Sequence, residues 1–257
     1  MKAAGKPGTT RYLRDYQLRR CANNHPDRSP WTLTTDELLT WLAGHDWAPE
    51  TLRGYRAALR SFYGWGHAAG RTDNNPAALL PTIRPVHHPP RPAPEDVLLA
   101  SLREAGDRER LMILLAARQG LRRSDIARVH SADLMLDLLG WSLRVRGKGN
   151  KERIVPLGPA VQAVVRSRLE EVGSGWLFPS PGGGHLTPAH VGVLVSRLLG
   201  PGWTTHTLRH RFATVAYGAE RDLLAVQELL GHSKVETTRG YIRFPDAALR
   251  AAVHAAA

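Results

Sequence analysis

Six prolines lie within residues 81–94, PTIRPVHHPPRPAP, and this stretch constrains the fold more than any other feature of the sequence. Proline fixes the backbone φ angle and lacks the N–H that a helix or a central strand needs, so neither element can run through this stretch. We therefore predict a linker at residues 85–94, with one domain at residues 1–84 and a second at residues 95–257. A chain of 257 residues has enough material for two modest domains.

Apolar periodicity predicts helices on both sides of this linker. Leucine and aromatic residues recur at spacings of three and four through residues 52–62, which marks one face of a helix. Thr34 and Glu37 have the spacing of a capping box ahead of another helix. Residues 134–157, LMLDLLGWSLRVRGKGNKERIVPL, predict strands joined by a tight basic turn. The expected fold class is therefore mainly α with a small β-sheet.

The balance of charge points to a polyanionic partner. The formal net charge is +12 and the isoelectric point is about 10.6, values typical of proteins that bind nucleic acid. The chain has 30 arginines and five lysines. A general preference for arginine in the encoding genome explains part of this excess, so charge by itself leaves nucleic-acid binding open.

Other bulk features favour a protein of the reducing cytosol. Cys21 is the one cysteine, which excludes an internal disulfide framework and fits a reducing compartment. No apolar run approaches the roughly 20 residues of a membrane helix, and the basic N-terminus is not followed by the apolar stretch of a signal peptide. The twelve histidines lack clustered ligand spacing with carboxylates, so we expect neither a metal site nor a cofactor.

Four motifs in the second part carry a specific resemblance. They are AARQGLRRSDIARV, GKGNKERIVPL, HTLRHRFAT, and LLGHS followed by TTRGYIR. Each motif alone is weak, but their order and spacing over about residues 110–245 resemble the tyrosine recombinases of the phage integrase family. The resemblance implies cutting and rejoining of DNA without a metal, through a 3′-phosphotyrosyl link and a Holliday junction.

The resemblance also implies a role for each matching residue. Tyr241 would be the nucleophile, and Arg122 and Arg209 would hold the non-bridging oxygens of the phosphate, which suits the planar guanidinium. His232 would donate a further hydrogen bond to the phosphate. His206 would assist proton movement near the tyrosine hydroxyl, because imidazole titrates near neutral pH.

Three further positions complete the implied site. Lys148 would protonate the 5′ leaving oxygen, although Lys151 lies close enough for the two lysines to exchange roles. Asp125 stands where the family often has glutamate, and its shorter carboxylate can still orient Arg122. His210 matches an accessory position and would support the site.

The family's architecture supplies expectations for the whole chain. Residues 1–84 would form a helical core-binding domain, and residues 95–257 a mixed α/β catalytic domain, the two closing on DNA as a C-shaped clamp. DNA contacts would come from basic residues in both parts: Arg53, Arg56, Arg60, Lys151 and Arg153. Four protomers would assemble on two DNA sites, and the C-terminal segment would dock on a neighbouring protomer.

Two expectations concern the ends of the chain. Only about eight residues precede the first predicted helix, so the chain resembles a simple integrase without an arm-binding domain. The small apolar residues Ala255, Ala256 and Ala257 resemble signals read by bacterial energy-dependent proteases, although an alanine-rich frayed end is the simpler interpretation.

Several alternatives remain open at this stage. A type IB topoisomerase would use the same tyrosine, arginines and histidine, and a DNA-binding regulator could keep the fold without catalysis. Within the recombinases, integration of a phage or mobile element is our leading hypothesis, and resolution of chromosome or plasmid dimers by an Xer-like enzyme is the alternative. The DNA target site and the base-reading residues are not evident from the sequence.

Overall fold

The structure is a computed structural model that describes residues 5–86, 89–138, 140–147, 152–232 and 235–242. The chain divides into two compact units, residues 1–88 and residues 89–257, and each is described by itself. The division falls inside the proline-rich stretch.

Some residues singled out from the sequence lie outside the described ranges. They are Lys148, Lys151, Ala255, Ala256 and Ala257, together with the rest of the C-terminal segment from residue 243.

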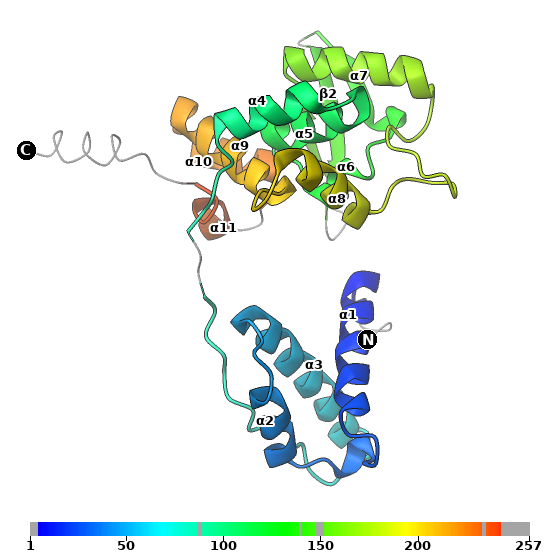
Figure 1. Cartoon of the computed structure of the whole chain (residues 1–257), viewed down its shortest axis with the longest axis vertical. Helices are drawn as coiled ribbons and strands as arrows, with labels where there is room; N and C mark the ends of the chain where they lie inside the picture. The colour runs from blue at the N-terminus through cyan, green and yellow to red at the C-terminus, as the bar shows by residue number, and fades with distance from the viewer. Residues whose placement is uncertain (1–4, 87–88, 139, 148–151, 233–234, 243–257) are drawn as a thin grey trace, which may run out of the picture. The chain divides into compact units, whose positions relative to one another are not determined.

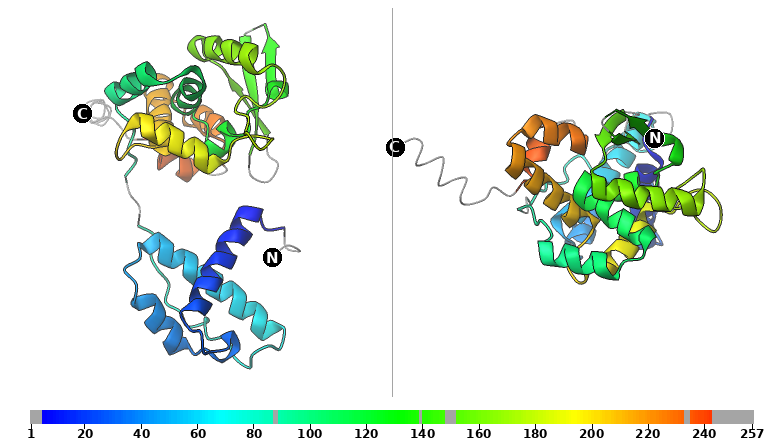
Figure 2. Two further views of the ribbon diagram at one scale, coloured as in Figure 1. Left: turned by 45° about the vertical axis from the view of Figure 1, so that its right-hand side comes forward. Right: turned by 90° about the horizontal axis from the view of Figure 1, so that it is seen from above.

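The regular elements described in the first unit are all helices. It contains α1 (Gly8–Asn23), a 3-10 turn at Pro30–Thr32, α2 (Thr35–Ala43) and α3 (Pro49–Ala68). Helix α1 lies across α3, as Figure 2 shows, and the buried faces of all three helices form one apolar core. The predicted capping box is present, because Glu37 N–H donates to Thr34 Oγ1 (3.3 Å) and Thr34 N–H donates to Glu37 Oε2 (2.8 Å).

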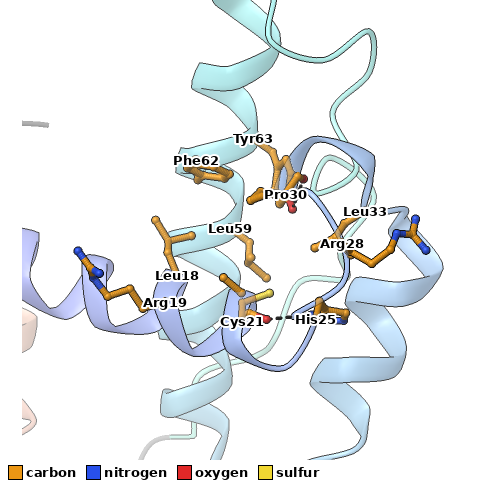
Figure 3. Close-up of a pocket in the computed structure, with 11 residues that line it drawn as sticks. Leu18, Arg19, Cys21, His25, Arg28, Pro30, Leu33, Leu59, Phe62 and Tyr63 are labelled. Atoms are coloured by element: carbon orange, nitrogen blue, oxygen red, sulfur yellow. Dashed lines mark hydrogen bonds between the residues drawn. The ribbon is translucent and has the colours of Figure 1, made fainter.

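An apolar pocket of about 190 Å³ opens beside this core, between α1 and α3 (Figure 3). Cys21, Leu59 and Phe62 are among the residues that line it. Burial raises the pKa of the Cys21 thiol to about 11, so the thiol stays protonated at neutral pH. None of the site residues predicted from the sequence lines this pocket.

The second unit consists of helices and a small sheet (Figure 1). Its described elements are α4 (Glu95–Glu104), α5 (Asp107–Gln119), α6 (Arg123–Ile126), a 3-10 turn at Ser131–Asp133, β1 (Leu134–Asp137), β2 (Gly140–Arg146), β3 (Glu152–Pro156), α7 (Pro159–Val172), α8 (Pro188–Leu199), α9 (Thr205–Glu220), α10 (Leu223–Leu230) and α11 (Val235–Arg239). The three strands are antiparallel in the order β1-β2-β3. The expected fold class, mainly α with a small β-sheet, is confirmed.

Helix α5 is the centre of this unit. Every residue from Leu111 to Ala117 is buried, so the helix contacts protein on all sides and packs against both α7 and α9. Because α5 ends at the turn that carries Arg122, this rigid packing sets the position of that turn. On β3, Arg153 and Val155 share one face of the sheet, and Val155 is fully buried.

The chain that enters the second unit is attached to the start of α9. The guanidinium carbon of Arg91 lies 4.3 Å from the centre of the Trp203 ring, a cation–π contact. Ala93 N–H donates to the carbonyl oxygen of Thr207 (3.0 Å). No helix among the described residues is both long and apolar enough to cross a membrane.

Candidate active site

The turn after α5 places Arg122. Gly120 has a φ of +63°, a left-handed conformation that strains other residues, and a Cβ at this position would overlap the ring of Phe212. Arg122 then occupies the N-cap position of α6. Its Nη2 donates to the carbonyl oxygen of Gly231 (3.2 Å), while 36% of the side chain remains exposed. The guanidinium is thus held at one edge and open to solvent at another.

Arg209, on α9, is 1% exposed. Its Nη1 donates to the carbonyl oxygen of Gly120, and its Nη2 donates to the carbonyl oxygen of Leu230 (2.6 Å). Burial, followed by the neighbouring Arg122, lowers the pKa of Arg209 to about 9. This value is still above neutral pH, so Arg209 remains a cation beneath the surface of the site.

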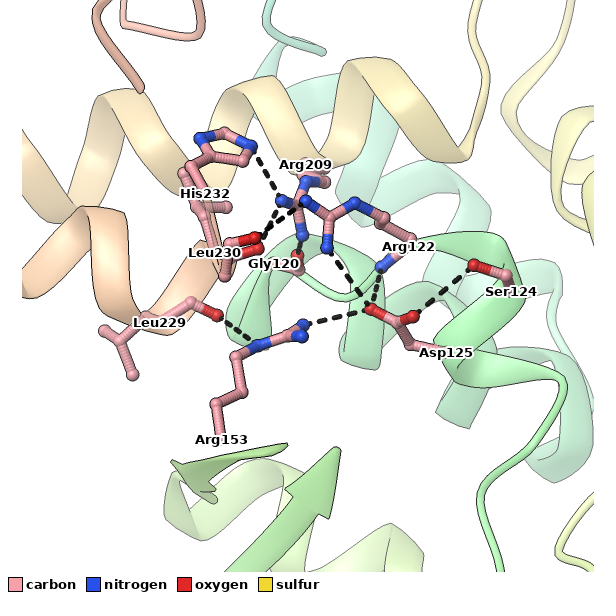
Figure 4. Close-up of polar contacts among 10 residues, drawn as sticks. Gly120, Arg122, Ser124, Asp125, Arg153, Arg209, Leu229, Leu230 and His232 are labelled. Carbon is pink, nitrogen blue, oxygen red and sulfur yellow. Dashed lines mark hydrogen bonds and ion pairs between the residues drawn. The ribbon is translucent and has the colours of Figure 1, made fainter. Parts of the chain in front are cut away.

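Asp125 connects two arginines (Figure 4). Its Oδ2 lies 3.0 Å from Arg153 Nη2 and 3.9 Å from Arg122 Nη1, and it also accepts from the backbone N–H of Arg122 (3.3 Å). Arg153 Nε donates to the carbonyl oxygen of Leu229 (2.9 Å), which ties β3 to the end of α10. Asp125 therefore contacts Arg153 more closely than it contacts Arg122, the arginine it was expected to orient.

The charges of this cluster do not balance. Within the part of the chain that the structure describes, Asp125 is the one carboxylate that pairs with Arg122, Arg153 or Arg209. Three guanidinium groups against one carboxylate leave a net charge of +2. Fixed guanidinium groups in a partly buried setting are well suited to bind a phosphate, through charge-assisted hydrogen bonds.

His232 lies against Arg209. Its Nε2 is 2.9 Å from Arg209 Nη2, and its Nδ1 is 3.0 Å from Thr238 Oγ1. The side chain of Gln227 donates to the backbone carbonyl of His232 (3.0 Å). Burial, followed by Arg209 and Arg122, lowers the pKa of His232 to about 3. The imidazole is therefore neutral at pH 7.

Tyr241 follows α11, and its half-buried ring is surrounded by histidines. The ring centre lies 4.4 Å from that of His210 in a stacked arrangement, 4.7 Å from that of His232 and 5.2 Å from that of His206. The guanidinium carbon of Arg209 is 5.6 Å from the ring centre. The phenol is thus brought to the arginine cluster although it lies just after α11, a separate and short helix.

His206 and His210 lie one turn apart on α9, with ring centres 4.4 Å apart. Burial, followed by Arg209, lowers the pKa of His206 below its ordinary value. Burial, followed by His206, lowers the pKa of His210 to about 4. A neutral imidazole can accept a proton, so His206 is chemically capable of receiving one from the neighbouring phenol, whereas the low pKa of His210 makes that ring a poor acceptor.

The structure brings together Arg122, Asp125, Arg153, His206, Arg209, His210, His232 and Tyr241 in one cluster. The arginines predicted on α3 have partners inside their own unit. Arg53 pairs with Glu50 (2.7 Å), Arg56 donates to the carbonyl oxygen of Leu80 (3.1 Å), and Arg60 donates to that of Ala78 (2.7 Å). These guanidinium groups are already engaged, so a phosphate would have to compete with those contacts.

Two residues of the cluster were missed by the sequence analysis. Thr238 and Gln227 both contact His232. Thr238 lies inside the motif TTRGYIR, but no role was assigned to it, and Gln227 lies outside the quoted motifs. Over the described residues, no group of three or more histidine, cysteine, aspartate or glutamate side chains is arranged to hold a metal ion.

A basic cluster beside a phenol, on a mainly helical domain with a small antiparallel sheet, is the arrangement that the motifs predicted for a tyrosine recombinase. Residues 95–247 match the model of the phage integrase family. Tyrosine recombinase XerC of Rhodospirillum centenum is 34% identical over 211 residues, a match that covers 72% of this chain and 59% of that protein. This chain therefore aligns with less than two thirds of that relative's length.

Solved structures of integrases are also similar to this chain. The integrase from mycobacterium phage Brujita is 28% identical, with a TM-score of 0.53 over 96% of this chain and 93% of that one. A lambda integrase dimer bound to a COC′ core site has a TM-score of 0.77 over 94% of this chain and 73% of that one, at 19% identity, which shows the shared fold. The chain belongs to the phage integrase family of tyrosine recombinases, so the resemblance inferred from the motifs is confirmed.

Proposed function

We propose that this protein is a site-specific DNA recombinase that cuts and rejoins duplex DNA through Tyr241. The observation that supports this most strongly is the cluster itself: three arginines with a net excess of positive charge lie beside a phenol and three neutral histidines. A metal-free attack on a phosphodiester requires a nucleophile, fixed cations and groups that can move protons, and the cluster contains all three.

The chemistry assigns one step to each group. The Tyr241 oxygen attacks the scissile phosphorus, a Tyr–O–P bond forms, and the bond from phosphorus to the 5′ oxygen breaks. Arg122 and Arg209 stabilise the charge on the non-bridging oxygens. His206 receives the phenolic proton, and Lys148 gives a proton to the 5′ oxygen. The bond to Tyr241 retains the energy of the cleaved phosphodiester, so rejoining needs no ATP.

Supporting roles fall to the neighbouring residues. Asp125 holds Arg153 in place, and Arg153 in turn braces the end of α10 against β3. His210 stacks on the Tyr241 ring and sets its position. His232 contributes a further hydrogen bond to the phosphate.

Duplex DNA is the partner we propose, and a lambda integrase dimer with a related fold is bound to a core site. The excess of 35 basic over 23 acidic residues supports this assignment. In this proposal the two units close around DNA as a C-shaped clamp, and four protomers exchange strands through a Holliday junction. A protein that acts on bacterial DNA would work in the cytosol.

Integration of a phage or mobile element remains our leading hypothesis for the biological reaction. The Brujita phage integrase supports it, because the match extends over nearly all of both chains. The alternative is an Xer-like reaction that resolves DNA dimers, and the identity with XerC favours that assignment. The two hypotheses share the same cleavage chemistry and differ in the DNA sites.

Covalent capture tests the proposal. Purified protein is mixed with host and candidate element DNA, the mixture is denatured, and the 3′ ends attached to protein are sequenced beside a Tyr241→Phe control. We expect adducts at one short inverted-repeat site, and none with the variant. An attachment site of a mobile element would support integration, and a chromosomal dimer-resolution site would support the Xer-like alternative.

Two results would contradict this function. Adducts that depend on Tyr241 but are scattered over all DNA would indicate a type IB topoisomerase. Tight, salt-sensitive DNA binding without any adduct would indicate a regulator that has kept the fold without catalysis.

A further inference from the structure

Thr238 connects two groups of the active site. It is completely buried on α11, and its hydroxyl oxygen lies 3.0 Å from His232 Nδ1. Its backbone carbonyl accepts the N–H of Tyr241 (2.9 Å). One residue thus contacts both the imidazole expected to bind phosphate and the backbone of the nucleophile.

The contacts of His232 define which ring nitrogen carries the hydrogen. A guanidinium can only donate hydrogen bonds, so His232 Nε2 must accept from Arg209 Nη2. In a neutral imidazole the hydrogen is then on Nδ1, and it is donated to the hydroxyl oxygen of Thr238. In the free protein, Nε2 therefore has no hydrogen to give to a phosphate.

A bound phosphate reverses this arrangement. A phosphate oxygen competes for Arg209, and the proposed role of His232 requires a hydrogen on Nε2. The groups that face His232 are Arg209 and His206 on α9, Arg122 before α6, Arg153 on β3, and the Tyr241 ring. Three of these groups are cations, and they oppose a positively charged imidazolium. Exchange between the two neutral tautomers is therefore the accessible route.

A hydroxyl is the kind of partner that allows this exchange. It accepts from Nδ1–H in one state and, after rotating, donates to bare Nδ1 in the other, whereas a carbonyl or carboxylate oxygen can only accept. We propose that Thr238 is a positioning residue that holds His232 in either tautomer, and that phosphate binding moves the imidazole hydrogen from Nδ1 to Nε2. The Nδ1 proton leaves to water and Nε2 takes one from water, so no net proton is bound. This inference rests on the proposed function.

The tautomer of His232 can be measured in the free protein. Correlation spectra of protein labelled with 15N-histidine show which ring nitrogen carries hydrogen, and loss of a signal in His232→Gln assigns it. We expect Nδ1–H in the wild type, in Thr238→Ser and in Thr238→Val, because Arg209 still donates to Nε2 in all three. The Nδ1–H signal should be shifted in Thr238→Val, which keeps the shape but lacks the hydroxyl that accepts this hydrogen. Thr237→Val, at an exposed neighbouring position, should match the wild type. A wild type with hydrogen on Nε2, or a Thr238→Val spectrum identical to wild type, would overturn the proposal.

Inorganic phosphate is the probe for the second state. Its addition should shift the wild-type and Thr238→Ser signals towards Nε2–H. A signal that keeps Nδ1–H when phosphate perturbs the arginine side-chain resonances would show that the imidazole does not exchange tautomers. Should Thr238→Val fold poorly in circular dichroism, Thr238→Ala replaces it, with the same expectation.

Kinetics provide an independent measurement on DNA. With a cleavable site from the covalent capture, Thr238→Val should form the phosphotyrosyl adduct roughly 10–100-fold more slowly, as when a group that orients a functional histidine is lost. The DNA dissociation constant should stay within about twofold, and Thr238→Ser should recover the rate. A normal rate of adduct formation in Thr238→Val would contradict the inference about Thr238. A wild type that forms no adduct would instead contradict the proposed function, and the tautomer measurement would then be the test of the role of Thr238.

Discussion

At the scale of single residues, the site combines a buried cation with neutral histidines. Arg209 is almost completely buried, and a buried charge is costly unless polar groups surround it. The carbonyl oxygens of Gly120 and Leu230 and the neutral ring of His232 supply those contacts. The same cation and the same burial keep His232 and His210 from taking up protons.

This coupling predicts that stability depends on pH. A histidine with a lower pKa in the folded than in the unfolded chain binds fewer protons when folded, so its contribution to stability is complete above about pH 6.5. That contribution is lost as the pH falls towards the folded pKa values of about 3 for His232 and about 4 for His210. We expect the free energy of unfolding to fall below pH 6.5, by at most about 1.4 kcal/mol per pH unit for each histidine.

Urea unfolding at pH 7.5, 6.5, 5.5 and 4.5 measures this dependence. His232→Asn should make the decline shallower, and His190→Asn, at an exposed position on α8, should not. Equal slopes in the wild type and His232→Asn would show that this histidine is not held neutral by the fold.

At the scale of elements, the connection from α5 to α6 determines where Arg122 and Arg209 meet. Gly120 ends α5, and its carbonyl oxygen binds Arg209. The ring of Phe212, on α9, fills the space that a side chain at position 120 would need. The two helices can approach closely only because this position has no Cβ.

Gly120→Ala should therefore be destabilising. The φ of +63° adds backbone strain, and the overlap with Phe212 adds a packing conflict, so we expect a loss of about 2–4 kcal/mol in the free energy of unfolding. Gly70→Ala is the matched control, because Gly70 lies just after the end of α3 with a φ of +65° and open space around it, and it should lose about 1 kcal/mol. Equal losses in urea titrations of the two variants would exclude the packing conflict.

A second prediction concerns the start of α4. Glu95 pairs with Arg211, which is buried on α9, and lies 3.7 Å from Arg118 on α5. Glu95→Gln removes the negative charge from two arginines at once, and we expect a loss of roughly 1–3 kcal/mol in unfolding free energy. Glu104→Gln, at an exposed position on the same helix, should change stability by less than about 0.5 kcal/mol. Equal unfolding free energies for Glu95→Gln and Glu104→Gln would mean that the ion pairs of Glu95 contribute nothing to stability.

At the scale of the whole molecule, charge is the dominant property. A net charge of +12 gives the chain an attraction for any duplex, independent of sequence. Arg53, Arg56 and Arg60 already have internal partners, so we expect other basic residues to supply a large part of this attraction.

We expect duplex binding to weaken by about 10³-fold or more between 50 and 200 mM salt, as for proteins that contact six or more phosphates. Fluorescence anisotropy with a labelled duplex gives the slope of log affinity against log salt. Arg60→Ala should leave this slope nearly unchanged, because Arg60 donates to the carbonyl oxygen of Ala78. A slope lowered by about one in Arg60→Ala would show that this residue leaves its internal partner to bind a phosphate.

Patterns that are local in sequence were predictable without the structure. The helix at residues 49–68, the capping box at Thr34 and Glu37, and the antiparallel pairing of β2 with β3 all follow from apolar spacing and turn residues. The family was predictable as well, because its motifs preserve residue types at short spacings. These features depend on contacts between residues that are close together in the sequence, so the order of residues is enough to predict them.

The sequence by itself therefore determined the elements, the family and the residue types of the site. Only the tertiary structure decided that Asp125 pairs more closely with Arg153 than with Arg122, that Arg209 is buried, and that Thr238 holds His232. Arg122 meets the carbonyl of a residue 109 positions away, and Arg209 meets one 89 positions away. Such contacts depend on how α5, α9 and α10 pack together, and no short stretch of sequence specifies that packing.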